Sequence, residues 1–311
     1  MRYFLMLLLL AAPIAHAAFT LDDNGKALTV LDNGKPVLVY NYTLVTPPAG
    51  VDAKFRRAGY IHPLYGLDGE TLTQDFPIDH RHHRGIFWAW PNSTIGEKPI
   101  DVWALEGVRE VHEAWLTKEA GADKAEIAVR NAWVFDTNPA DPQVRETVRF
   151  TVLPASDRGR AIDFDITVEN VAKADFTIRG ATTQNKGYGG FCFRPDATRM
   201  PMTFTDAKGG VPEDVLVDET PWADVSFPVK KGEAKLSGAA IFEHPRNPGY
   251  PFPGWILRHY GFLGASWPHT NPHTLKPGET FQLRYRLYVH RGNAEDAKVK
   301  DAFDAYTAQA K

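Results

Sequence analysis

The strongest constraint on the fold is a regular alternation of apolar and polar residues near the end of the chain. Over residues 280–290 the apolar set is Phe281, Leu283, Tyr285, Leu287 and Val289. The polar set between them is Gln282, Arg284, Arg286 and Tyr288. Residues 161–171 repeat the pattern, and residues 126–135 and 144–152 follow it less regularly. Successive side chains of a strand point to opposite faces, so this pattern predicts antiparallel strands with one face buried.

Turn signals fit the same fold class. Asn24–Gly25 and Asn33–Gly34 each separate two short apolar runs, and such pairs supply the positive φ of tight hairpins. Prolines gather in residues 244–253 and 267–277, which we expect to be loops rather than central strands. The sequence therefore predicts an all-β protein built as a large antiparallel β-sandwich.

One helix is expected, at the C-terminal end. Asn293 suits an N-cap, and Glu295 and Asp296 suit the positive end of the helix dipole. Val299, Phe303 and Tyr306 then recur at helical spacing. We expect a helix over residues 293–310 that packs on the outside of the sheets.

The first residues have the form of an export signal. Arg2 precedes an apolar run over residues 4–12, and Ala15 and Ala17 supply the small residues of a cleavage site. The run is about half of the roughly 20 apolar residues that a membrane span needs. We expect residues 1–17 to be a cleaved signal peptide and 18–311 to be one β-sandwich domain. The mature protein is then secreted or periplasmic, with no membrane segment after leader cleavage.

Composition excludes some classes of partner. The formal net charge is −3 and is spread along the chain, whereas a nucleic-acid partner would require a basic patch. Cys192 is the only cysteine, so no disulfide forms within the chain, and we expect this thiol to be buried. Nothing in the sequence marks an obligate protein partner.

The densest polar cluster is the run from Asp79 to Arg84, which contains His80, His82 and His83. Burying so many polar groups requires dedicated partners, and this favours a functional role. In an extended run, His80, His82 and Arg84 would share one face. A neighbouring guanidinium favours a neutral imidazole, which suits a general base. We expect His82 or His83 to transfer protons, Asp79 to orient a histidine, and Arg84 and Arg194 to stabilise negative charge.

A metal site is the alternative interpretation of the same run. His80, His82 and His83 are possible ligands, because imidazole binds Fe, Cu and Zn. The flanking arginines favour an anionic partner over a divalent cation. The acid/base hypothesis needs no cofactor, whereas the alternative needs a divalent metal.

Other polar and aromatic residues are expected to gather around this run in space. They lie in short segments with glycine, proline and aromatic neighbours, which suit binding of an oxygen-rich ring. The expected substrate-binding residues are His62, Glu70, His80, Lys186, Tyr188, His244, Arg246, His259, Trp88 and Trp255.

The sequence resembles the bacterial family commonly labelled PmoA or "methane oxygenase". The matching segments are residues 60–65, 79–85 and 187–190 with Arg194, together with 244–248 and 255–268. The resemblance implies a galactose-mutarotase-like supersandwich and a place in carbohydrate utilisation. The family label itself implies a metal-dependent oxygenase.

Three functional hypotheses follow. The first is an exported carbohydrate-active enzyme, a hydrolase or lyase that acts on a glycoside by histidine acid/base catalysis. The second is a histidine-ligated metalloenzyme of oxygenase type. The third is a non-catalytic module that binds sugar through its tryptophans.

Overall fold

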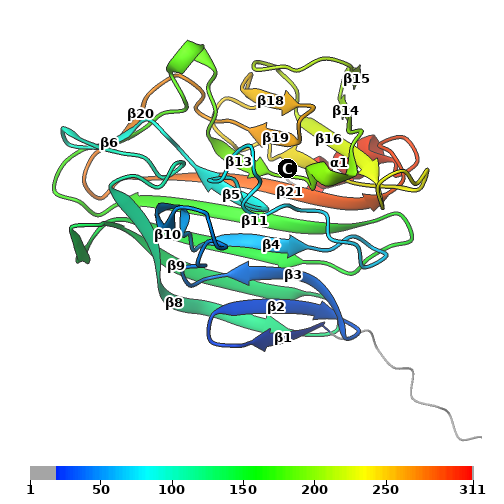
Figure 1. The fold of residues 1–311 in the computed structure, drawn as a ribbon, viewed down its shortest axis with the longest axis horizontal. Helices are drawn as coiled ribbons and strands as arrows, with labels where there is room; N and C mark the ends of the chain where they lie inside the picture. Colours follow the sequence, from blue (N-terminus) through cyan, green and yellow to red (C-terminus); the bar gives the residue numbers. More distant parts are fainter. Residues whose placement is uncertain (1–18, 310–311) are drawn as a thin grey trace, which may run out of the picture.

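Two large antiparallel sheets pack face to face in the computed structural model, which describes residues 19–309 (Figure 1). The predicted leader, residues 1–17, lies outside the described residues. In order, the first sheet contains β1 (Phe19–Asp23), β2 (Ala27–Asp32), β3 (Lys35–Asn41), β4 (Tyr60–Leu64), β5 (Ile86–Ala89), β13 (Gly190–Phe193), β19 (Phe262–Ala265) and β18 (Trp255–Arg258). This arrangement confirms the predicted all-β sandwich.

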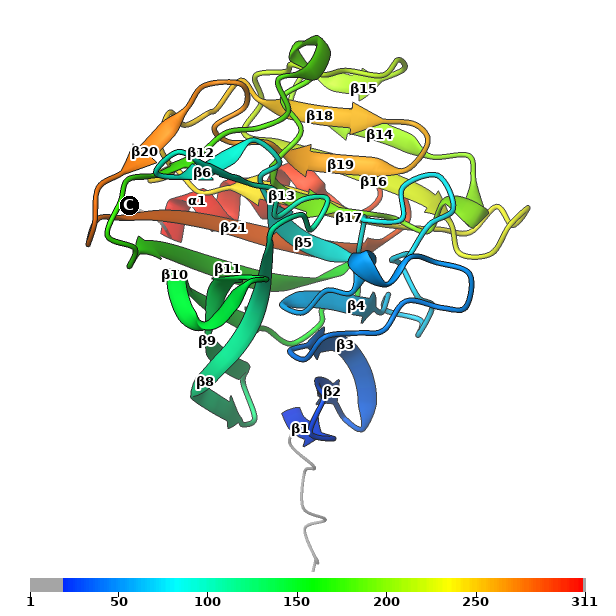
Figure 2. The same cartoon turned by 60° about the vertical axis from the view of Figure 1, so that its left-hand side comes forward.

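The second sheet contains the longest strands. In order, they are β15 (Gly209–Val211), β14 (Thr203–Asp206), β16 (Trp222–Pro228), β17 (Leu236–Glu243), β21 (Thr280–Arg291), β11 (Gly159–Asn170), β10 (Asn138–Val152), β9 (Ala125–Phe135) and β8 (Val108–Ala120). A small third sheet contains β20 (His273–Leu275), β12 (Phe176–Ile178), β6 (Ser93–Ile95) and β7 (Lys98–Ile100). Figure 2 shows this small sheet above one end of the long strands. Three short 3₁₀ turns, Ala53–Phe55, Thr183–Asn185 and Ala197–Arg199, lie in the connections.

The alternation in β11 and β21 works as predicted. The two strands pair so that Phe164 lies opposite Tyr285 and Ile162 opposite Leu287, all at most 2% exposed. Burial of such side chains contributes about 1.5–3 kcal/mol each. On the outer face, Arg286 donates to both carboxylate oxygens of Asp163 at 2.6 and 2.8 Å.

Aromatic contacts join the two large sheets. Phe191 of β13 stacks on Tyr285 at a ring distance of 4.8 Å and also meets Phe164 at 5.1 Å. Tyr40 of β3 packs against Phe150 of β10 at 5.5 Å. One connected core runs through these contacts, from Phe19 at the start of β1 to the end of β21. The inner faces of both sheets are therefore closed to ligands.

The predicted hairpins are present. Gly25 connects β1 to β2 with φ of 80°, and Asn33 and Gly34 connect β2 to β3 with φ of 50° and 73°. These left-handed conformations explain the Asn-Gly pairs. Cys192 is free and fully buried, as expected.

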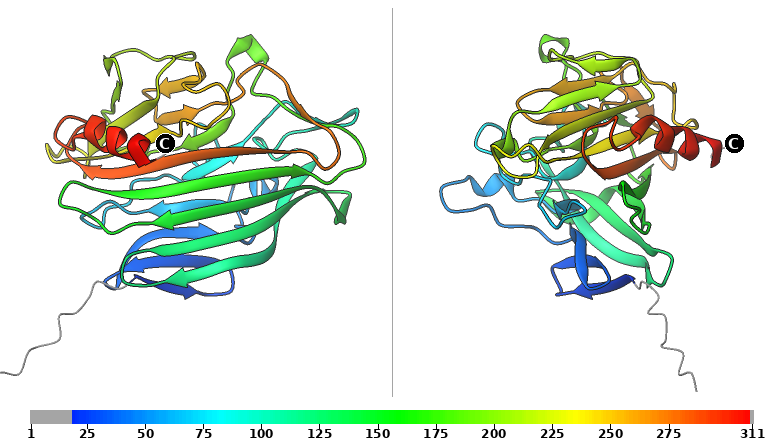
Figure 3. Two further views of the ribbon diagram at one scale, coloured as in Figure 1. Left: turned by 180° about the vertical axis from the view of Figure 1, so that it is seen from behind. Right: turned by 90° about the vertical axis from the view of Figure 1, so that its right-hand side faces the viewer.

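The helix is shorter than the sequence pattern suggested. Asn293 accepts backbone hydrogen bonds from Glu295 and Asp296, but it caps a separate turn. Lys298 has φ of 54° and interrupts the chain before α1, which spans Val299–Gln309. Figure 3 shows α1 on the outside of the second sheet, where Phe303 packs against Phe242 at 5.5 Å. The start at Asn293 was wrong because the capped turn does not continue into the helix, whereas the outer packing is confirmed.

The expected loop over residues 267–277 contains the short strand β20. β20 lies at the edge of the small sheet, where flanking prolines are tolerated. Within residues 19–309, no helix has the length and apolarity that a membrane span requires.

Candidate functional site

Strand pairing brings the histidine run and Arg194 together. β5 and β13 are antiparallel, with Ile86 opposite Phe193. The run that ends just before β5 therefore lies beside Arg194, which follows β13 and donates its backbone N–H to Gly85 O at 2.8 Å. β19 pairs with β13 on its other side. The turn through Tyr260, which precedes β19, therefore lies at the same end of the strands as the histidine run and Arg194.

The residues of the histidine run form tight turns rather than an extended strand. His80 N donates to Pro77 O, and His83 N donates to His80 O at 2.9 Å. The rings of His80 and His83 consequently stack at 4.6 Å with an interplanar angle of 9°. Tyr260 stacks on the other face of His80 at 4.9 Å. The face sharing expected for an extended run is therefore wrong, because these turns place side chains three residues apart next to each other.

These rings border a cavity of about 460 Å³, which we call the histidine cavity. It lies over the outward face of the first sheet, under Trp103, which meets His83 edge-on at 5.3 Å. The lining residues are His80, His82, His83, Pro91, Trp103, Ala181, Lys186, Tyr188, Arg258 and Tyr260. Five of the expected residues line this cavity: His80, His82 and His83 from the run, together with Lys186 and Tyr188.

Asp79, His80 and Arg194 form a hydrogen-bonded set beside the cavity. His80 Nδ1 lies 2.8 Å from Asp79 Oδ2, and Arg194 Nη2 donates to both oxygens of Asp79 at 2.8 and 2.9 Å. Burial alone would raise the pKa of Asp79, but the hydrogen bonds from His80 and Arg194 outweigh it and lower this pKa. Asp79 is therefore an anion that fixes the orientation of the His80 ring, as the sequence analysis expected for one histidine.

His82 and His83 are held neutral. Burial, and after it the neighbouring His80 and the arginines, lowers the pKa of His82 to about 3. Burial, and after it the neighbouring His82 and Arg194, lowers the pKa of His83 well below its ordinary value. Arg194 Nη1 lies 3.5 Å from His83 Nδ1, which is consistent with a neutral acceptor nitrogen.

The opposite wall carries cationic groups. Arg258 Nη1 donates to Tyr188 OH at 2.5 Å, while Arg258 Nε pairs with Asp214 at 2.7 Å. Among residues 19–309, no carboxylate pairs with Lys186, which also faces the cavity. None of the ten lining side chains is a carboxylate. The cavity therefore suits an oxygen-rich ligand with an anionic group.

Arg84 has a structural role instead of the expected catalytic one. It is fully buried and donates to the carbonyl oxygens of Arg81 at 2.8 Å, of His83 at 2.7 Å and of Phe55. Its Nε also lies 3.3 Å from Asp75. These bonds turn the guanidinium away from the cavity, and they hold the turns that present the histidines.

Trp88 and Trp255 point away from the cavity. Both lie on the inward face of the first sheet, in line with Phe191 across β5, β13, β19 and β18. Trp88 Nε1 donates to the buried Glu146 at 2.6 Å. Because side chains alternate along a strand, the outward positions belong to Phe87 and Arg258 instead.

The remaining expected binding residues also lie outside the cavity. His62 contacts Thr73 Oγ1 at 2.9 Å, and Glu70 packs against the turn at Gly66. His244 meets Tyr306 of α1 at 5.7 Å, and the neighbouring Arg246 is exposed. His259 does not line the cavity either, but it pairs with Asp214, the carboxylate that also holds Arg258.

Sequence reasoning missed Trp103, Arg258 and Tyr260. Arg258 could have been found from the alternation of side chains along β18. This alternation puts Arg258 on the face opposite to Trp255, and the cavity lies on the face of Arg258. No local pattern marks Trp103, whose position depends on a turn between β7 and β8. The glycines near Tyr188 serve packing, since a Cβ on Gly187 would lie 1.9 Å from the His269 ring.

The three histidines do not fit a shared metal ion. Imidazole lone pairs lie in the ring plane, so the parallel rings of His80 and His83 cannot both aim at one ion. His82 is perpendicular to His83, at 90°. Within the described part of the chain, no three His, Cys, Asp or Glu side chains are arranged to hold a metal.

Comparison with solved structures finds weak similarities in three carbohydrate-related chains. A galactose mutarotase-like protein from Lactobacillus casei is 10% identical with a TM-score of 0.41, over 88% of this chain and 100% of that chain. An alpha-galactosidase from Geobacillus stearothermophilus has the same identity and TM-score, over 92% of this chain. A heparan sulfate lyase from Pedobacter heparinus is 12% identical with a TM-score of 0.38, over 91% of this chain. The chain spans only 41% of that galactosidase and 37% of that lyase.

No curated protein matches the sequence. A protein-family model matches residues 27–304, a range that includes β5, β13, β18 and β19 beside the histidine cavity. The chain therefore belongs to the family of unknown function DUF6807.

Proposed function

We propose that the protein is a carbohydrate-active enzyme in which His80 transfers the proton and Asp79 orients it. The observation that carries this proposal is the Asp79–His80 pair, at 2.8 Å, beside a cavity large enough for a sugar ring. In this proposal Asp79 accepts a hydrogen bond from Nδ1–H of His80, and this leaves Nε2 unprotonated as the base. Positioned proton transfer by such a group contributes roughly 10²–10⁴-fold to rate.

His80 replaces His82 and His83 in this role because of their surroundings. A histidine with a pKa of about 3 is a weak base near neutral pH, and His82 has such a pKa. His83 is only 1% exposed and contacts Arg194. Neutral neighbours also avoid repelling the positive charge that His80 gains when it accepts a proton.

Among hydrolases and lyases, the lining groups favour a lyase. Glycoside hydrolysis commonly uses two carboxyl groups that flank the bond, and the histidine cavity has no carboxylate lining. Elimination needs one base and cations that stabilise an anion. His80 would remove the proton on the carbon next to the carboxylate of an acidic sugar, while Lys186 and Arg258 hold that carboxylate. The C–H electrons then form a C=C bond, and the glycosidic oxygen leaves with its bonding pair. That oxygen takes up a proton from water, and His80 releases the proton it removed to solvent.

The test is the activity of His80→Gln on acidic oligosaccharides, followed by the ultraviolet absorbance of the new C=C bond. We expect turnover to fall roughly 10²–10⁴-fold with little change in KM. His244→Gln is the control, because His244 lies against Tyr306 of α1 and does not line the histidine cavity. It should retain wild-type turnover.

Two outcomes contradict the proposal. Full activity in both His80→Gln and Asp79→Asn would remove this pair from the chemistry and favour a binding module. Loss of activity with a chelator, restored by a divalent metal, would favour the metalloenzyme hypothesis. Export of the enzyme to the periplasm or medium is part of the same proposal and rests on the leader pattern of residues 1–17.

A further inference from the structure

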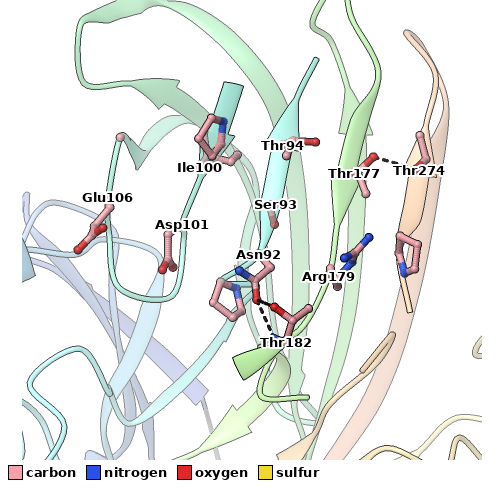
Figure 4. A pocket seen from close by; sticks show the side chains of 14 residues that line it. Asn92, Ser93, Thr94, Ile100, Asp101, Glu106, Thr177, Arg179, Thr182 and Thr274 are labelled. Carbon is pink, nitrogen blue, oxygen red and sulfur yellow. Dashed lines mark hydrogen bonds between the residues drawn. The ribbon is translucent and has the colours of Figure 1, made fainter. Parts of the chain in front are cut away.

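A second and larger cavity adjoins the histidine cavity. It measures about 690 Å³ and lies over the small sheet, and we call it the hydroxyl trough (Figure 4). Pro91 lines both cavities, and Thr182 of the trough follows Ala181 of the histidine cavity. Asn92 Oδ1 accepts from Thr182 N at 2.8 Å and fixes this shared wall. The two spaces are therefore neighbours along one surface.

The trough is lined by groups that suit a sugar. β6, β12 and β20 turn the hydroxyls of Thr94, Thr177 and Thr274 toward it, and Thr182 adds a fourth hydroxyl from the neighbouring loop. Ser93 Oγ is buried and donates to Trp90 O instead. Thr177 and Thr274 are already positioned by their mutual bond of 2.8 Å. Pro91, Pro99 and Pro272 add apolar surface for the C–H faces of a ring.

The carboxylates of the trough already have hydrogen-bond or ion-pair partners, whereas its arginine does not. Figure 4 shows Asp101 and Glu106 on one side and Arg179 on the other. Asp101 Oδ1 already accepts from Trp103 N and Ala104 N at 2.8 and 2.7 Å, and Glu106 pairs with Lys54 at 3.1 Å. Within residues 19–309, by contrast, Arg179 has no side-chain partner, although it is half-buried.

Each cavity thus presents one cation without a carboxylate partner among the described residues: Lys186 in the histidine cavity and Arg179 in the trough. We infer that the trough is a second subsite for the same substrate chain, and that it takes an acidic sugar whose anionic group binds Arg179. This inference rests on the proposed function for the adjoining cavity. It names the substrate as an oligosaccharide with acidic groups on neighbouring units.

Calorimetry with the mature protein tests the subsite. The ligands are a uronate monosaccharide, a uronate tetrasaccharide, the same tetrasaccharide with its carboxyls reduced, and a sulfated neutral tetrasaccharide. We expect Arg179→Gln to weaken binding of the uronate tetrasaccharide roughly 10- to 100-fold, the worth of a hydrogen bond to a charged group. Binding of the monosaccharide and of the reduced tetrasaccharide should not change. The sulfated tetrasaccharide tests which anionic group Arg179 binds. If Arg179→Gln weakens its binding as much as that of the uronate tetrasaccharide, sulfate is also an accepted group.

Arg158→Gln is the matched control. Arg158 is exposed and lies before β11, whereas the trough lies near the other end of that strand. The control should bind all ligands as the wild type does, and thermal melts verify that both variants fold. Equal affinity of Arg179→Gln and wild type for every acidic tetrasaccharide would overturn the inference.

The two proposals fail separately. Arg179-dependent binding of a tetrasaccharide that is never cleaved supports the subsite and refutes the lyase. Cleavage of the tetrasaccharide with no dependence on Arg179 in either binding or KM supports the lyase and refutes the subsite.

Discussion

Acid should destabilise the protein through His82, and the structure gives the size of the effect. The folded protein holds the pKa of His82 at about 3, against an ordinary value of 6.5. The folded state therefore disfavours the proton, while the unfolded chain binds it below pH 6.5. Each pH unit below that value costs about 1.4 kcal/mol until the folded pKa is reached. At pH 5 the loss from His82 is about 2 kcal/mol relative to pH 8.

Replacement of His82 by glutamine removes this titrating group. We expect the free energy of unfolding of His82→Gln to fall about 2 kcal/mol less than that of wild type between pH 8 and pH 5. His83 has a pKa shifted in the same direction, so part of the acid sensitivity remains in the variant. The comparison within each protein across pH cancels any constant cost of the substitution itself.

Urea unfolding at pH 8, 6.5 and 5, followed by tryptophan fluorescence, measures this difference. Trp103→Phe is the control, because it alters the same cavity wall at His82 without removing an ionisable group. Its loss of stability between pH 8 and pH 5 should equal that of wild type. An equal loss in His82→Gln and wild type would refute the conclusion that the fold holds His82 neutral.

Two further predictions follow from the sheets and the leader. Leu287 is fully buried on the inner face of β21, so Leu287→Ala should lower the free energy of unfolding by about 2–5 kcal/mol. Arg286 lies on the outer face, and Arg286→Gln should lower it by at most about 1 kcal/mol. Urea unfolding measures both, and similar costs would contradict the assigned faces. Mass spectrometry of the exported protein should find Ala18 as its first residue, and an intact Met1 would contradict the predicted cleavage.

The strands β9, β10, β11 and β21 of the second sheet could be predicted because alternation is a local pattern, whereas their order in the sheet could not. In β11 and β21, every second residue is apolar, and a slip of one residue in their pairing would turn all of them to the outer face. The Asn-Gly hairpins have the same property, since the turn conformation is encoded in two residues. The start of α1 could not be read in this way, because a capped turn and a helix N-terminus share the same sequence signal at Asn293.

The candidate site was predicted in part. The sequence by itself identified the run from Asp79 to His83, together with Arg194, Lys186 and Tyr188, because polar groups at such density require partners. It also predicted that Asp79 would orient a histidine, and the structure places Asp79 Oδ2 2.8 Å from His80 Nδ1. Only the tertiary structure decided which histidine, because Arg194 and Tyr260, which hold Asp79 and the His80 ring, come from segments more than 100 residues away in sequence.

Tertiary structure also decided which side of the first sheet carries the histidine cavity. Trp88 and Trp255 carry strong local signals, yet the face of each depends on which side of the sheet the second sheet covers. That choice is made by contacts between strands about 100 residues apart in sequence, such as Phe191 on Tyr285. Alternation within a strand fixes which residues share a face, and only the packing of the two sheets fixes which face remains open to a ligand.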